Sequence, residues 1–210
     1  MKYKYILFDF DGTIADTEDV NFDIFQQLAS KYKLRQVEKE ELPFLKKMSA
    51  SQIMKDLNVK AYRLPLMLRQ GKKILKENIV NIKFCQEDTV EVLKEIKKQD
   101  LKIGIITTNS RQNVNKFLNI NDAEIFDVVY SASMFGKESK FKKIMKKNNL
   151  TPRDILYVGD EIRDIDSAHK CNIDVASVSW GYNDRESLLE NNPNYIVDEF
   201  SELLEIIRLT

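Results

Sequence analysis

Histidine and cysteine are nearly absent from this 210-residue sequence, and their scarcity excludes several kinds of active site. The single histidine, His169, falls within an expected helix, so a histidine-dependent catalytic triad is hard to build around it. The two cysteines, Cys85 and Cys171, lie far apart and form no CxxC pattern. Reduced structural thiols are therefore the simplest interpretation of both.

Net charge and long apolar runs are also missing. Lys and Arg number 33 and Asp and Glu number 33, so the chain lacks the basic excess typical of nucleic-acid-binding proteins. Six lysines between Lys137 and Lys147 are best explained as a solvated surface, with a basic helix face as the alternative. No run approaches a membrane span, and an expected strand begins so near Met1 that no room is left for a cleaved leader. We expect a soluble, cytoplasmic protein with no membrane partner.

Short apolar runs and helical periodicity alternate along most of the chain. The runs at 5–8, 101–108, 126–131, 154–159 and 174–178 predict strands, and 195–197 predicts a short edge strand. Helices are expected near 88–99, 111–118, 140–148, 163–170 and 201–209. Alternation of this kind predicts right-handed βαβ units and an open parallel sheet. The expected fold class is therefore α/β, with a Rossmann-like core.

One long segment departs from this alternation. Residues 16–83 contain helical periodicity near 18–32, 37–48, 49–57 and 61–78 and nothing that reads as a strand. The segment follows the first strand directly. We therefore expect a core domain formed by residues 1–15 and 84–210, with residues 16–83 inserted as a small all-helical cap domain.

Asp9 and Asp11 end the first expected strand and are followed at once by Gly12. Side chains two residues apart in extended chain point the same way, so the two carboxylates would lie side by side. Their repulsion would be relieved by a proton or by a hard divalent cation such as Mg²⁺. Taken alone, this stretch is equally consistent with an ordinary Asp-Gly turn.

Three further polar segments follow later strands, where sites form in open α/β sheets. Thr107-Thr108-Asn109-Ser110 offers hydroxyl and N–H groups to an anion, or simply a helix cap. Lys137 precedes a helix and could neutralise a phosphate, with Lys140 as its competitor. In Gly159-Asp160-Glu161-Ile162-Arg163-Asp164, Asp160 and Asp164 share a helix face, although acids at a helix start also favour the helix dipole.

The order and placement of these four segments resemble the haloacid dehalogenase-like (HAD) hydrolase superfamily over the whole chain. Asp9-Phe10-Asp11-Gly12-Thr13 is similar to the first and most specific signature of that family, and the segment from Gly159 to Asp164 looks like its fourth. Within the superfamily, the sequence looks most like the phosphoglycolate phosphatase-like branch. The sequence departs from many relatives at Glu138, which stands where they have proline after the motif-three lysine.

The resemblance implies a role for each motif. Asp9 would be the nucleophile that forms an aspartyl-phosphate, and Asp11 the general acid/base. Lys137 would neutralise charge on both nucleophile and phosphate. The groups expected to hold phosphoryl oxygens are Thr108, the N–H of Asn109, Gly12 and Lys137. The groups expected to hold Mg²⁺ are Asp9, Asp11 through its carbonyl, Asp160 and Asp164.

The resemblance implies a Mg²⁺-dependent phosphatase acting on a small phosphorylated metabolite, as a monomer or homodimer. Aspartate at position 11 favours phosphatase or mutase chemistry over dehalogenase chemistry. A phosphomutase of the β-phosphoglucomutase type shares the same residues and stays open. A non-catalytic module that binds phosphate or Mg²⁺ is the third alternative, and the intact residue set argues against it.

Overall fold

A single parallel sheet forms the centre of the molecule. The computed structural model describes residues 2–133 and 136–209. Within them, six parallel strands are ordered β3-β2-β1-β4-β5-β6, which confirms the predicted Rossmann-like sheet. The strands are β1 (Tyr5–Phe8), β2 (Lys102–Thr107), β3 (Val128–Ser131), β4 (Ile155–Gly159), β5 (Asp174–Val178) and β6 (Tyr195–Val197). The first strand is central, so whatever follows it lies in the middle of the carboxyl edge.

Side chains of β1 alternate between two apolar layers. Ile6 and Phe8 belong to one cluster of buried residues, whereas Tyr5 and Leu7 belong to another. The first cluster also contains residues of helices α5 (Thr89–Lys98), α6 (Arg111–Ile120) and α10 (Glu202–Leu209). The second contains residues of α7 (Glu138–Asn148), α8 (Ile162–His169) and α9 (Arg185–Glu190). Burial on both faces explains why these strands read as continuous apolar runs.

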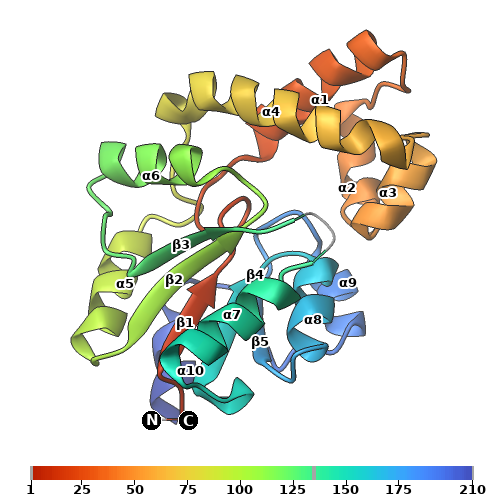
Figure 1. Cartoon of the computed structure of the whole chain (residues 1–210). Coiled ribbons are helices and arrows are strands. Elements are labelled where there is room, and N and C mark those ends of the chain that lie inside the picture. Colours follow the sequence, from red (N-terminus) through yellow and green to blue (C-terminus); the bar gives the residue numbers. More distant parts are fainter. Residues whose placement is uncertain (1, 134–135, 210) are drawn as a thin grey trace.

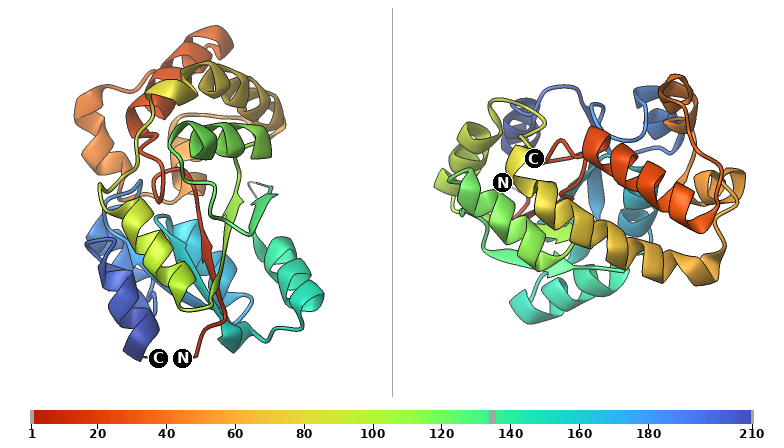
Figure 2. Two further views of the ribbon diagram at one scale, coloured as in Figure 1. Left: turned by 90° about the vertical axis from the view of Figure 1, so that its left-hand side faces the viewer. Right: turned by 90° about the horizontal axis from the view of Figure 1, so that it is seen from above.

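The remaining helices lie together above the carboxyl edge of the sheet, and both chain termini lie at the opposite end (Figure 1). They are α1 (Glu18–Tyr32), α2 (Leu42–Leu45), α3 (Ala50–Asp56) and α4 (Leu64–Asn78), with short 3₁₀ turns at Lys39–Glu41, Ala61–Arg63 and Ile79–Asn81. Seen from above, α1 and α4 run side by side across the sheet (Figure 2). Asp16 N donates to Lys83 O at 2.9 Å, so the two ends of this helical segment meet where it joins the sheet.

Two local predictions differ from the structure. The helix expected over 37–48 is a 3₁₀ turn followed by the short α2, because Pro43 has no N–H and therefore occupies the first turn of a helix rather than its interior. Helix α9 was not expected from the sequence. A further 3₁₀ turn, Pro152–Asp154, leads into β4.

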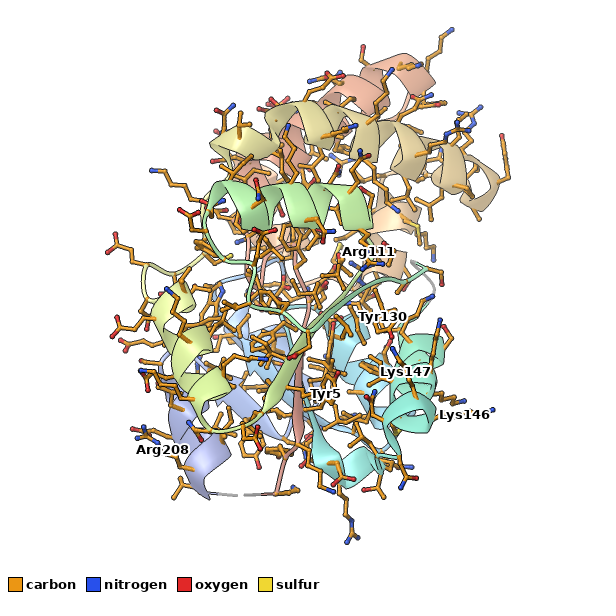
Figure 3. The ribbon with its side chains drawn as sticks, turned by 60° about the vertical axis from the view of Figure 1, so that its left-hand side comes forward. Tyr5, Arg111, Tyr130, Lys146, Lys147 and Arg208 are labelled. Atoms are coloured by element: carbon orange, nitrogen blue, oxygen red, sulfur yellow. The ribbon has the colours of Figure 1, made fainter. Side chains whose placement is uncertain are left out.

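The lysines of α7 lie on the outer surface. Lys146 and Lys147 are exposed there, beside the sheet edge that carries Tyr130 (Figure 3). Lys143 lies over the Tyr130 ring, with Nζ 5.6 Å from the ring centroid. Lys142 is exposed as well, and such exposure is consistent both with a solvated face and with a basic binding surface. Among the described helices, none has the length and apolar character needed to cross a membrane.

Candidate active site

Strand β1 delivers Asp9 to the centre of the carboxyl edge. The N–H of Asp9 donates to Val158 O at 2.8 Å, which continues the ladder between β1 and β4 by one residue. The chain then turns at Gly12, whose φ of +78° lies in the left-handed region. A Cβ at Gly12 would lie 2.4 Å from Asp160 Oδ2 and 2.6 Å from the Tyr182 ring. Glycine is therefore required for its conformation and for space.

Gly12 has no free donor for a phosphate in this structure. Its N–H donates to Ala15 O at 2.9 Å, inside the turn that follows β1. Gly12 therefore allows close packing in this structure, and its expected part in phosphate binding stays a prediction. The turn allows the strand end and the motif around Asp160 to approach each other.

A buried cluster joins the first, third and fourth motifs. Asp9, Asp160 and Asp164 each offer a carboxylate oxygen within 4.8 Å of the others. Lys137 Nζ lies 2.5 Å from Asp9 Oδ2 and 2.7 Å from Asp164 Oδ1, and it donates to the Tyr157 hydroxyl at 2.5 Å. Burial opposes the charge of Lys137, yet the Asp164 and Asp9 carboxylates raise its pKa. The ammonium thus neutralises part of the buried negative charge.

The geometry distinguishes Lys137 from its competitor Lys140. The side chain of Lys137 is almost fully buried within the cluster. Lys140 lies one turn into α7 and is partly exposed. Lys137 is therefore the lysine that this fold brings to Asp9.

Asp160 is held by contacts that the sequence did not predict. Thr13 Oγ1 donates to Asp160 Oδ1 at 2.6 Å, and the N–H of Tyr182 donates to Asp160 Oδ2 at 2.8 Å. A Cβ at Gly181 would lie 2.2 Å from the Asp160 Cβ. Trp180 Nε1 also donates to Thr13 O at 3.2 Å. The loop after β5 therefore supports the site, and the only sequence signal for this was the place of Trp180-Gly181-Tyr182 at a strand end.

Asp11 is kept apart from this cluster. Asn109 Nδ2 lies 3.1 Å and 3.2 Å from the two Asp11 oxygens, and Thr107 Oγ1 lies 3.4 Å from one of them. Burial, followed by the charge of Asp9, raises the pKa of Asp11 to about 6. A carboxyl group with such a pKa can both give and take a proton near neutral pH.

Neighbouring residues of the second motif, Thr107 to Ser110, make different contacts in the structure. The N–H of Asn109 donates to Thr107 Oγ1 at 2.9 Å in this structure, and its donation to a phosphoryl oxygen stays a prediction. Ser110 caps α6 by accepting from Asn113 N at 3.1 Å. Thr108 is partly exposed and lines three cavities above the sheet. Both predicted phosphate ligands of this motif, Thr108 and Asn109, line the 330 Å³ cavity.

Glu161 and Arg163 form an ion pair at the start of α8 that the sequence analysis missed. The Arg163 guanidinium bonds the Glu161 carboxylate, and Glu161 also caps α8 by accepting from the N–H of Asp164. Arg163 lines cavities of about 330 and 230 Å³, and Glu161 lines the larger one. Both residues stand inside the fourth motif, but a charge pair two residues apart has no distinctive sequence signal.

The residues present fit a hard divalent cation. The described part of the site has five carboxylates and two cationic side chains. The carboxylates are Asp9, Asp11, Asp160, Glu161 and Asp164, and the cations are Lys137 and Arg163. Burial, with the nearby Glu161 charge, raises the pKa of Asp160 well above its usual range. A cation with oxygen ligands would relieve this repulsion.

The loop after β5 also ties the sheet to the helical segment above it. Asn183 Nδ2 donates to Lys46 O at 2.7 Å and Met48 O at 2.9 Å, while its Oδ1 accepts from Ile162 N at 2.9 Å. The Tyr182 hydroxyl contacts Thr17 Oγ1 at 3.0 Å. Groups that support Asp160 and α8 are thus bonded directly to residues 17–48.

The histidine and the two cysteines, which the sequence analysis set aside as catalytic candidates, have no catalytic environment in the structure. His169 ends α8 and is exposed. Cys171 is buried and free, and Cys85 is partly buried and free. Burial raises the pKa of the Cys85 thiol, so it is a poor nucleophile.

Comparisons with known proteins agree with this geometry. The sequence model of the haloacid dehalogenase-like hydrolases matches residues 6–178. A phosphoglycolate phosphatase of Synechococcus elongatus is 25% identical over 204 residues, covering 96% of each chain. The pyrophosphatase PpaX of Bacillus mycoides is 28% identical over 213 residues, covering 99% of this chain and 98% of the relative.

Solved structures show the same fold. A predicted phosphatase from Clostridium acetobutylicum superposes with a TM-score of 0.85 at 22% identity and covers 100% of both chains. A putative β-phosphoglucomutase from Thermotoga maritima superposes with a TM-score of 0.66 at 18% identity and covers 99% of both. The family match extends from β1 into β5 and includes all four motifs. The chain is therefore an enzyme of the haloacid dehalogenase-like hydrolase family.

Proposed function

We propose that this enzyme is a Mg²⁺-dependent phosphatase that hydrolyses a small phosphorylated metabolite through an aspartyl-phosphate on Asp9. One observation carries the proposal. Lys137 Nζ lies 2.5 Å from Asp9 Oδ2 in the buried cluster, while Asn109 holds Asp11 two residues away and outside that cluster. Two neighbouring carboxylates in such different surroundings suit a nucleophile and a separate acid/base.

The two carboxylates divide the reaction into two displacements at phosphorus. An Asp9 oxygen attacks phosphorus, the bond from phosphorus to the leaving oxygen breaks, and protonated Asp11 gives its proton to that oxygen. In the second step Asp11 takes a proton from water, whose oxygen attacks phosphorus and releases phosphate and free Asp9. Thr108 and Lys137 bind phosphoryl oxygens throughout.

The acidic cluster is proposed to hold the metal. Mg²⁺ bound among Asp9, Asp160 and Asp164 would offset the repulsion between a phosphate dianion and an anionic nucleophile. Thr13 and the N–H of Tyr182 fix the orientation of Asp160 for this purpose.

Residues 16–83 are proposed to act as a cap domain over a core of residues 1–15 and 84–210. The cap would exclude water during the first displacement and select the leaving group. Support comes from the helices above the carboxyl edge and from the 330 Å³ cavity between them and Thr108. We propose that the enzyme works in the cytoplasm, as a monomer or homodimer.

Hydrolysis of a generic aryl phosphate tests the proposal. Purified wild-type protein should be active with Mg²⁺ and inactive with EDTA, and Asp9→Asn should lower turnover by on the order of a thousandfold or more. Asp122→Asn is the matched control, because Asp122 is exposed after the end of α6 and belongs neither to the cluster nor to the linings of the cavities described above. Turnover that survives Asp9→Asn would refute the assigned nucleophile. Transfer of phosphate to a sugar in place of water would favour a phosphomutase.

A further inference from the structure

The cavity above Asp11 is mostly apolar. It measures about 330 Å³ and lies between α1, α3, α4 and the carboxyl edge of the sheet. Each of the three helices contributes apolar side chains to it, among them Phe25, Met54 and Leu68. All three are only partly buried by the protein itself. Ligand sites of this volume are commonly apolar with a few placed polar groups.

The hollow is bounded by two units of buried apolar side chains in the helical segment, and α1 and Val59 contact both of them. Helices α1 and α4 approach closely at Gly71, where a Cβ would lie 3.3 Å from Ile24 Cγ2. A second apolar cluster forms around Val37, Leu45 and Leu57. Leu57 also lines the cavity, as do Ile24 and Gly71, so the hollow lies between the two units.

The hollow is continuous with the proposed phosphoryl site. Asp11, Thr108 and Asn109 line the same cavity as the apolar side chains. Asp11 is the group that would protonate the leaving oxygen. A leaving group attached to that oxygen would therefore extend from Asp11 into the apolar space.

Charge in the cavity disfavours a second anionic group on the substrate. Lys72 and Arg163 are the cationic side chains that line it among the described residues, and Arg163 already pairs with Glu161. The carboxylates of Glu161 and Asp11 line it as well. A carboxylate or second phosphate would lose hydration against the apolar walls and would lie near the Glu161 carboxylate.

We propose that the substrate is a phosphomonoester with a largely apolar leaving group, which fills the hollow beneath α1, α3 and α4. This inference rests on the proposed phosphatase function. A cavity of about 330 Å³ lies at the lower end of the roughly 300–1,000 Å³ range of small-molecule sites, so it suits a small leaving group. Alkyl or aryl phosphates of that size fit, whereas phosphates bearing a short carboxylate leave the walls uncovered.

Isothermal titration of the full-length protein with n-alkylphosphonates, in the presence of Mg²⁺, tests the proposal without turnover. Affinity should rise about fourfold for each methylene that becomes fully buried, until the cavity is filled. Phosphonoacetate, which carries a second anion, should bind no more tightly than methylphosphonate. Affinity that is independent of chain length, or a clear preference for phosphonoacetate, would overturn the proposal.

Two substitutions on α4 locate the effect. Leu68→Asn should abolish most of the increase in affinity with alkyl chain length, because Leu68 lines the cavity. Leu66→Asn is the matched control, since Leu66 is 49% exposed on the same helix. Equal chain-length dependence in both variants would place the alkyl chain elsewhere and refute the site. The series on the wild type stands on its own if either variant fails to fold.

Aryl phosphate hydrolysis, measured in parallel, separates this inference from the function on which it rests. If the protein hydrolyses the aryl phosphate but its affinity for alkylphosphonates does not depend on chain length, the proposed substrate class is refuted and the proposed phosphatase function stands. If affinity rises with chain length but no aryl phosphate is hydrolysed, the proposed phosphatase function is refuted and an apolar phosphonate-binding site remains.

Discussion

Replacing Lys137 with methionine should destabilise the fold strongly, because the lysine is the buried counter-charge of two carboxylates. Its ammonium lies 2.5 Å from Asp9 and 2.7 Å from Asp164, and these three side chains are at most 3% exposed. Methionine retains the apolar length of the side chain but leaves both carboxylates without their cation. The substitution therefore tests charge rather than volume.

The expected cost follows from the burial. Removing one partner of a buried ion pair costs about 3–5 kcal/mol, since the remaining charge stays desolvated. For a chain of this size, the loss corresponds to a fall in melting temperature of roughly 6–20 °C. Burial already raises the pKa of Asp9 against the opposing charge of Lys137. In Lys137→Met the pKa of Asp9 should rise further, so the folded state takes up a proton as the pH is lowered from 8 towards 5. The difference in free energy of unfolding between the variant and the wild type should therefore shrink over that range.

Urea denaturation in EDTA at several pH values measures this cost without a metal to replace the ammonium. Lys140→Met is the matched control, because Lys140 lies on the same helix and is partly exposed, and its cost should stay within about 0.5 kcal/mol. A Lys137→Met protein within about 1 kcal/mol of the wild type at pH 8 would refute the assigned ion pairs. A deficit that grows on acidification would refute the electrostatic explanation.

Two more predictions concern the support of the site and the base of the sheet. Asn183→Leu should cost about 2–4 kcal/mol in urea denaturation, because it leaves the N–H of Ile162 and two carbonyls in the helical segment without partners; an unchanged midpoint would contradict this account. Hydrogen bonds from Lys4 and Thr151 hold the pKa of Asp154 down to about 2. Asp154→Asn should therefore cost about 1 kcal/mol at pH 7 after solvent screening, with the difference from wild type narrowing as the pH falls from 4 towards 2. A constant difference over that range would contradict the assigned pKa.

Local sequence order determined the strands and most of the residues at their ends. Apolar runs of four to eight residues, each followed by polar groups, predicted five of the six strands within two residues at either end, and the sixth at Tyr195–Val197 as the structure has it. Parallel strands bring their carboxyl ends to one edge, so Asp9, Thr108 and Asp160 had to converge once the strands were known. The choice between Lys137 and Lys140, which the sequence left open, depends on the structure, which places Lys137 against Asp9.

Contacts between distant segments were decided only by the tertiary structure. Thr13 and Asp160 are 147 positions apart, and Asn183 bonds residues 135 and 137 positions before it. Neither periodicity nor local spacing encodes such pairs, because they depend on the register between strands and on how the helical segment sits above the sheet. The same holds for the 330 Å³ hollow, which exists because two groups of apolar side chains face each other across a space. The sequence thus determined which chemical groups reach the edge of the sheet, and packing decided which partners hold them and what shape of molecule fits above them.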